Sequence, residues 1–135
     1  MPTLLLKVSP LQNPSRYAAL ASALTRITAD TLGKRAEVTA VVIDDIPAAR
    51  WYVGGRDVPR PTALLEISIT QGTNTAEEKA SFIATAFAEL ERQLGSGQPL
   101  EPASYVIVRE VPATDWGYGG QTQAARRVAL VGTAP

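Results

Sequence analysis

The sequence predicts an α+β fold in which two fused β-α-β units form one four-stranded sheet with two helices on one face. The first observation is an internal match between residues 2–9 (PTLLLKVS) and residues 61–68 (PTALLEIS). A second match follows in the same order, between residues 45–55 (DIPAARWYVGG) and residues 110–120 (EVPATDWGYGG). Two ordered matches indicate that one structural unit has been duplicated along the chain.

Length and composition agree with a single domain. The chain has 135 residues, 45% of them hydrophobic and 19% charged, which is enough apolar surface for one core. We therefore expect one domain over residues 1–135, built from repeats 2–55 and 61–120 with a C-terminal tail at 121–135. Residues 128–131 (VALV) predict an edge strand in that tail, pairing with an adjacent subunit.

The first helix is expected after the opening strand, where apolar residues recur three and four positions apart. Asn13 and Pro14 provide a cap and a first helical residue, and Gly33 provides a stop. The expected apolar face consists of Tyr17, Leu20, Leu24 and Ile27.

The second helix has clearer end signals. Thr75 and Glu78 fit a capping box at its start, and Gly95 ends it. Its expected apolar face consists of Ile83, Phe87, Leu90 and Leu94.

The remaining strands are predicted at residues 38–46 and 104–111, which are rich in β-branched side chains. A helical crossover makes the two strands of each unit parallel and right-handed. Both helices then cover the same face of the sheet and leave the other face open. That open face would carry Ala40, Val42, Tyr105 and Ile107, so we expect an oligomer.

Charge and residue usage exclude several function classes. Thirteen Lys and Arg balance thirteen Asp and Glu, so we expect neither a nucleic-acid partner nor a membrane partner. The chain has no His and no Cys, which excludes Ser-His-Asp and Cys-His nucleophiles, His- or Cys-ligated metals and disulfides. With no signal peptide and no apolar run of membrane-spanning length, we expect a cytoplasmic protein.

Three features together resemble the tautomerase superfamily, in the longer 4-oxalocrotonate tautomerase-like form made of two fused units. They are Pro2 directly after Met1, the duplicated β-α-β plan, and the aromatic-X-X-Gly-Gly endings at 51–55 and 116–120. The resemblance spans roughly residues 2–120. It implies a homotrimer that uses the open sheet faces, and a reaction that needs no cofactor and no metal.

Pro2 is the candidate catalytic residue, because removal of Met1 would convert it into a free secondary amine. An α-amino group has a pKa near 8, and apolar surroundings lower that pKa further, so a neutral base exists near pH 7. We expect Leu4 and Leu6 to supply those surroundings. Pro61, the counterpart of Pro2, is a tertiary amide without basicity.

The resemblance also indicates where substrate contacts are expected. Relatives that act on dicarboxylates use arginines in the loop after the first strand and early in the last strand. The first position here holds polar residues such as Gln12, and the second holds Ala40 and Tyr105. This difference argues against a doubly charged substrate of the usual kind.

Four residues remain candidate substrate contacts. Trp51 and Trp116 match the aromatic that walls the site in relatives, although either could instead pack in the oligomer core. Tyr105 could polarise a substrate carbonyl or be an interface residue. Arg109 could bind an anion or form a surface ion pair. Weaker candidates of the same kinds are Tyr118, Arg50, Arg126 and Arg127.

The preferred hypothesis is a keto–enol tautomerase in which Pro2 moves a proton between oxygen and carbon of a small 2-oxo acid or its enol. The same proline could instead support decarboxylation, hydration or dehalogenation. A third hypothesis is a trimeric ligand-binding homologue without catalysis.

Overall fold

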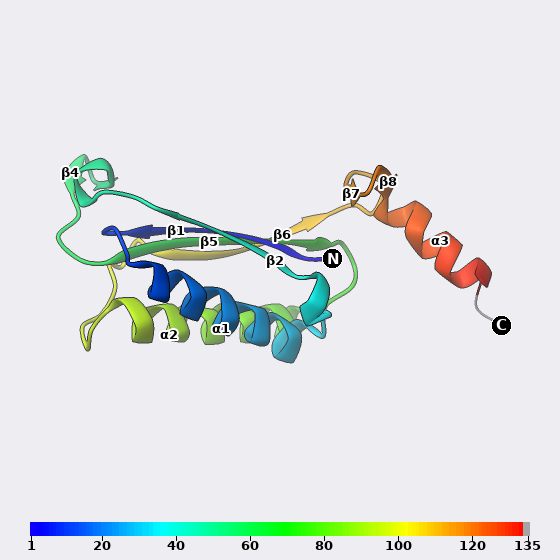
Figure 1. Cartoon of the computed structure of the whole chain (residues 1–135), viewed down its shortest axis with the longest axis horizontal. Helices are drawn as coiled ribbons and strands as arrows, with labels where there is room; N and C mark the ends of the chain where they lie inside the picture. The colour runs from blue at the N-terminus through cyan, green and yellow to red at the C-terminus, as the bar shows by residue number, and fades with distance from the viewer. Residues whose placement is uncertain (134–135) are drawn as a thin grey trace.

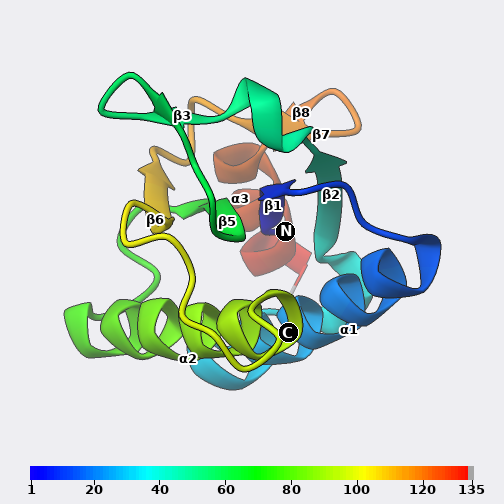
Figure 2. The same ribbon diagram turned by 90° about the vertical axis from the view of Figure 1, so that its left-hand side faces the viewer.

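The computed structural model describes residues 1–133, and the side chains of residues 1–129. Its centre is a four-stranded sheet in the order β2-β1-β5-β6. The first unit contributes β1 (Thr3–Ser9), α1 (Pro14–Leu32) and β2 (Ala40–Asp45), and the second contributes β5 (Thr62–Thr70), α2 (Ala76–Leu94) and β6 (Tyr105–Val111). Both helices lie under the same face of the sheet (Figures 1 and 2). The predicted fold class is confirmed.

The two units meet through an antiparallel pair of central strands. Within each unit the strands are parallel, β1 with β2 and β5 with β6. β1 and β5 run in opposite directions, so that Thr3 lies opposite Ser68 and Ser9 lies opposite Thr62. Pro2 and Pro61 therefore lie at opposite ends of the sheet.

Both helices begin and end where the capping residues predict. The Asn13 side chain accepts a hydrogen bond from the Arg16 N–H, and Gly33 adopts the left-handed conformation at φ 68°. Thr75 and Glu78 form the complete capping box at the start of α2. Gly95, in contrast, has right-handed angles, and a Cβ there would lie 2.1 Å from the Gln98 carbonyl oxygen. This glycine is needed for a close approach and not for a positive φ.

The buried face of α2 differs from the predicted face by a rotation of about one residue. Phe82 is fully buried, whereas Ile83 is 39% exposed and Phe87 is only partly buried. The small side chain of Ala86, one turn after Phe82, allows that line of the helix to approach the sheet closely. The periodicity gave the correct helix but assigned Ile83 to the core in error.

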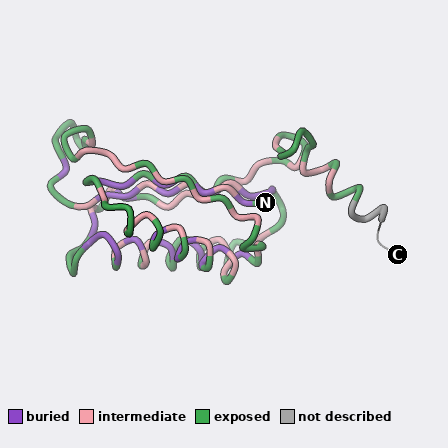
Figure 3. Tube along the Cα trace, viewed as in Figure 1, coloured by how far each residue is buried: buried purple, intermediate pink, exposed green. Residues whose placement is uncertain are grey.

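The second face of the sheet is open, as the pattern predicts. Val42 is 55% exposed and Tyr105 is 62% exposed. Burial alternates along the central strands β1 and β5 (Figure 3), because successive side chains of a strand point to opposite faces of the sheet.

Short hairpins follow the outer strands β2 and β6. β3 (Tyr52–Val53) pairs with β4 (Arg56–Asp57), and β7 (Gly117–Tyr118) pairs with β8 (Gln121–Thr122). The two glycines at each turn all have positive φ, as this type of tight hairpin requires. A short 3₁₀ turn at Ala36–Val38 precedes β2, and another at Ala48–Arg50 precedes β3.

The predicted edge strand in the C-terminal tail is wrong, because residues 128–131 lie within a helix. α3 (Gln123–Thr133) follows β8 directly and extends beyond the end of the sheet (Figure 1). The Thr122 hydroxyl accepts a hydrogen bond from the Ala125 N–H at 3.0 Å, and this cap starts the helix. The alanines and arginines that follow favour helix.

Among the described residues, no helix has the length and apolar character needed to cross a membrane.

The rotation of α2 gives a stability prediction. Phe82→Ala should lower the free energy of unfolding by about 3–5 kcal/mol, because it leaves a cavity in the core. Ile83→Ala should lower it by less than about 1 kcal/mol, because that side chain already contacts water. Urea unfolding at one fixed protein concentration measures both, with Phe82→Leu as a milder variant. Equal losses for the two alanine variants would contradict the observed helix orientation.

Candidate functional site

Pro2 occupies a buried position at the start of β1. Its carbonyl oxygen accepts a hydrogen bond from the Ala40 N–H at 3.1 Å, which fixes it against the start of β2. The residue is buried, whereas Met1 before it is 42% exposed. The proline ring therefore lies at the boundary between the sheet and solvent.

A small cavity of about 70 Å³ opens at this position. The first repeat contributes Met1, Pro2, Thr3, Val38 and Ala40, and the end of the second repeat contributes Trp116, Gly117, Tyr118 and Gln123. Residues from both ends of the chain thus meet around Pro2. The apolar walls include Val38 and Ala40. Leu4 and Leu6, expected at this place, belong to the core under the sheet instead.

Trp116 is the tryptophan that meets Pro2 within the chain. Its indole N–H donates a hydrogen bond to the Thr70 hydroxyl at 3.2 Å, which fixes the ring at the end of β5. Trp51 immediately precedes the β3–β4 hairpin, at the opposite end of the sheet (Figure 1). A site role for Trp51 stays a prediction that would need a second chain.

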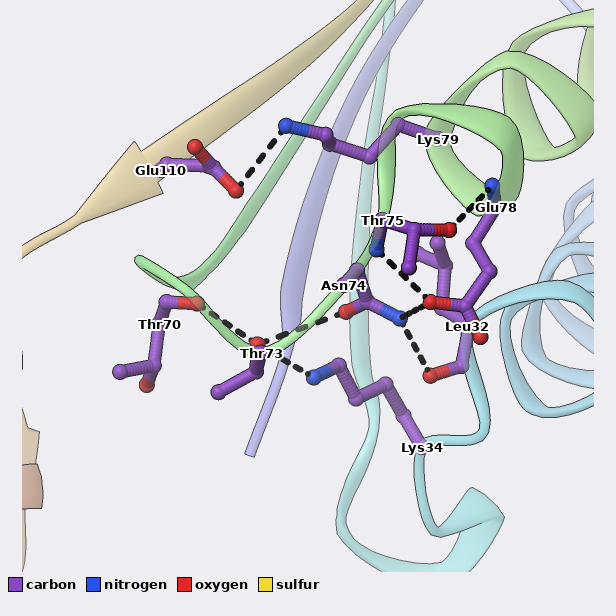
Figure 4. A network of polar contacts seen from close by, with 9 residues as sticks. All are labelled: Leu32, Lys34, Thr70, Thr73, Asn74, Thr75, Glu78, Lys79 and Glu110. Atoms are coloured by element: carbon purple, nitrogen blue, oxygen red, sulfur yellow. Dashed lines mark hydrogen bonds and ion pairs between the residues drawn. The ribbon is translucent and has the colours of Figure 1, made fainter.

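Lys34 is held close to this wall by a chain of hydrogen bonds. Its ammonium donates to the Thr73 hydroxyl at 2.9 Å, and that hydroxyl donates to the Thr70 carbonyl at 2.6 Å. The Asn74 amide ties the same loop to the end of α1 through the Leu32 carbonyl at 2.9 Å (Figure 4). Thr70 therefore connects a cation and an aromatic wall, one through its carbonyl and the other through its hydroxyl.

The electrostatics at the N-terminus favour a neutral amine. Burial lowers the pKa of the N-terminal amine, and the positive charges of Lys34 and Arg35 lower it further. The pKa of Lys34 is itself lowered, first by burial, with Glu78 opposing that effect and the charge of Arg127 adding to it.

The sequence did not single out Lys34 or Arg35. Both follow Gly33 at the end of α1, where basic residues are ordinarily explained by the helix dipole. Their nearness to Pro2 depends on the parallel pairing of β1 with β2 and has no local signal.

Tyr105 and Arg109 lie elsewhere on the open face. Tyr105 pairs with Leu64, which lies opposite Lys7, so it is roughly 17 Å along the strands from Pro2. Arg109 forms an ion pair with Glu66 at 3.2 Å. Neither residue lines the cavity beside Pro2, and their site roles stay predictions.

Comparisons with known proteins all point to tautomerases. The family model "Tautomerase enzyme" matches residues 6–58. A crystal structure of a native fused 4-OT is 30% identical, covers 91% of this chain and 97% of its own, and has a TM-score of 0.78. The fused 4-OT called F6, a wild-type asymmetric trimer, is 28% identical over 92% and 98% of the two chains, with a TM-score of 0.80. The fused 4-OT called R7, also a wild-type asymmetric trimer, is 27% identical, covers 93% of this chain and 98% of its own, and has a TM-score of 0.81. A search of curated proteins finds no match.

The cationic surroundings of the N-terminal amine give a second prediction. Because the chain lacks His and Cys, that amine is the group expected to titrate closest to neutral pH. In Trp51→Phe, where Trp116 is the remaining tryptophan, fluorescence should follow this titration with a pKa below 8. Adding Lys34→Gln should raise that pKa, because one positive charge is removed.

Trp116→Phe, which keeps Trp51, is the matched control and should show no transition in this range. A transition in the control but not in Trp51→Phe would show that the other tryptophan meets the amine.

Proposed function

Because this chain belongs to the tautomerase superfamily, we propose that it is a cofactor-independent keto–enol tautomerase of small 2-oxo acids, with Pro2 as the catalytic residue. The observation that carries this proposal is the location of Pro2, which is buried and faces a cavity walled by Trp116. Burial, followed by the charges of Lys34 and Arg35, lowers the pKa of the N-terminal amine. A neutral amine beside a cation is suited to move a proton in an anionic substrate.

The proposal requires that Met1 be removed. With Met1 attached, the nitrogen of Pro2 is a tertiary amide that neither carries a proton nor accepts one readily. After removal it becomes a secondary amine, and burial at this position would lower its pKa and so favour the neutral form.

The proton transfer proceeds in two steps. The Pro2 amine first takes the hydroxyl proton of the enol, and the electron pair left behind is shared between that oxygen and the conjugated carbon. The resulting ammonium then gives its proton to that carbon, which restores the carbonyl group and the free amine. In this way one group acts as base and then as acid, with no net gain or loss of protons.

Lys34 lies outside the lining of the cavity, but of the two cations that lower the pKa of the N-terminal amine we propose that Lys34 holds the substrate carboxylate. Arg35 already pairs with Glu37 at 2.7 Å, whereas Lys34 donates to a neutral hydroxyl in Thr73. A half-buried ammonium binds an anion more strongly than one in bulk water, because screening is weaker. Trp116 and Tyr118 would form the opposite walls.

We further propose that the functional form is a homotrimer. Fused 4-OT relatives are described as trimers, and the open sheet face of this chain exposes large apolar side chains such as Val42 and Tyr105. Packing these faces together would remove apolar surface from water.

The catalytic proposal predicts a loss of activity in Pro2→Ala. Ketonisation of phenylenolpyruvate, followed by ultraviolet absorbance, should slow by about a hundredfold or more without its base. The wild-type rate should rise with pH through the lowered amine pKa, because only the neutral amine accepts a proton. Intact-mass measurement establishes whether Met1 is absent. Equal rates for both proteins, or retained Met1 in an active sample, would refute catalysis by Pro2.

The trimer proposal predicts a mass three times the 14.3 kDa of the chain in light scattering. Val42→Glu should shift this mass toward the monomer, since it places a charge on the open sheet face. Ile83→Glu is the matched control, because Ile83 is a partly exposed apolar residue on the helix side. Dissociation by both variants, or by neither, would argue against assembly through the sheet face.

A further inference from the structure

A small hollow lies at the centre of the open sheet face. It has a volume of about 140 Å³ and is lined by Leu5 and Lys7 of β1 and by Leu64 and Glu66 of β5. β1 and β5 are the two central strands of the sheet, and Leu5 is 47% exposed. The middle of the face that is proposed to pack in the homotrimer therefore contains charged as well as apolar side chains.

The four lining residues occupy equivalent positions of the two repeats. The first internal match of the sequence aligns Leu5 with Leu64 and Lys7 with Glu66. Because β1 and β5 are antiparallel in matching register, a half-turn about the centre of the sheet brings one strand onto the other. This half-turn places leucine on leucine, but it places an ammonium group where the other repeat has a carboxylate. The two halves of the hollow therefore share the apolar residue and differ in the sign of the charge.

The outer strands repeat this inversion. Asp44 of β2 and Arg109 of β6 each stand directly before the second internal match of the sequence, and both are exposed. Asp44 lies beside Lys7 in the parallel pairing of β2 with β1, and Arg109 forms an ion pair with Glu66 at 3.2 Å. On the open face, the first repeat thus has its cation on the central strand and its anion on the outer strand, and the second repeat has the reverse order.

These charges restrict how the open face can be covered. Lys7 and Asp44 form no ion pair within the part of the chain that the structure describes. Burying a charged group is costly unless an opposite charge meets it. The second repeat of a neighbouring copy presents a carboxylate at the position equivalent to Lys7, whereas a first repeat presents another lysine there. Like charges brought together destabilise a contact, so the charges favour contact between unlike repeats.

We propose that the open faces of neighbouring copies meet with the first repeat of one copy against the second repeat of the next, and that Lys7 pairs with Glu66 of the partner subunit. This inference rests on the proposed homotrimer and states which halves of the face come together. A contact between unlike halves is head-to-tail, and head-to-tail contacts can close into a ring. Each copy then uses both halves of its face, one toward each neighbour.

Inverting the charges of one half at a time tests this arrangement. Lys7→Glu with Asp44→Arg inverts the first half, and Glu66→Lys with Arg109→Glu inverts the second half. Both double variants keep the net charge of zero. Either one makes the two halves alike in charge, so the protein concentration at half-assembly should rise about tenfold or more. All four substitutions together restore unlike halves and should return that concentration to within about threefold of the wild type.

A mixture of the two double variants separates contacts between chains from contacts within one chain. In a mixed ring, two of the three contacts join unlike charges, so the mixture should assemble at a lower concentration than either variant alone. Light scattering over a dilution series measures assembly, and circular dichroism establishes that each variant is folded. Lys7→Gln is a milder variant, which removes the cation without inverting it and should weaken assembly less than the double variants do.

Lys79→Glu with Glu110→Lys is the matched control, because it inverts an ion pair on the helix side of the sheet and should assemble like the wild type. Double variants that assemble like the wild type, a control that dissociates as they do, or a mixture that assembles no better than its components would overturn the pairing of unlike repeats. A wild type that stays at 14.3 kDa at every concentration would refute the homotrimer and this arrangement together. Catalysis by Pro2 is tested separately by the rate of Pro2→Ala.

Discussion

The antiparallel pairing of β1 with β5 is the constraint on which the candidate site depends. Each repeat alone would place its opening proline at one end of a two-stranded sheet and its closing hairpin at the other. Pairing the two repeats in opposite directions brings the β7–β8 hairpin of the second repeat to the end where the first begins. The cavity at Pro2 therefore combines Val38 and Ala40 with Trp116 and Tyr118. Neither repeat contains a complete site.

The same pairing creates a second, equivalent end that has diverged. There the carbonyl of Pro61 accepts the Glu101 N–H at 2.9 Å, just as Pro2 accepts that of Ala40. The backbone arrangement is thus repeated, but Pro61 lies within the chain and its nitrogen is an amide. Duplication preserved the structural role of the proline, whereas only a proline at a chain end can also supply a basic amine.

Divergence is also visible where each helix meets its outer strand. In the first repeat the Tyr17 hydroxyl donates to the Asp45 carboxylate, and this bond is the largest cause of the lowered pKa of Asp45. In the second repeat Lys79 forms an ion pair with Glu110 at 3.2 Å. Both pairs join the first turn of a helix to the far end of a strand. Both repeats therefore have a polar contact between the start of the helix and the end of the outer strand. This contact is a hydrogen bond in the first repeat and an ion pair in the second.

How much the sequence predicts follows from the range of each signal. Helix ends are set by residues a few positions apart, so Asn13, Gly33 and Thr75 identify them directly. The facing of α2 is harder, because Phe82 and Ile83 are both apolar and only packing against the sheet separates them. Strand pairing between distant segments decides which tryptophan lines the cavity at Pro2, namely Trp116 and not Trp51. It also brings Lys34 close to the N-terminal amine.

The net charge of the chain says nothing about where the individual charges lie in the fold. A net charge of zero predicts no general electrostatic partner, yet it hides an uneven distribution of charge. Lys34 and Arg35 follow α1, whereas Arg127 belongs to α3, and their charges act at one end of the sheet. At this end partial burial lowers the pKa of the N-terminal amine, and the charges of Lys34 and Arg35 lower it further. The site's chemistry follows from where the fold gathers charges that cancel over the whole chain.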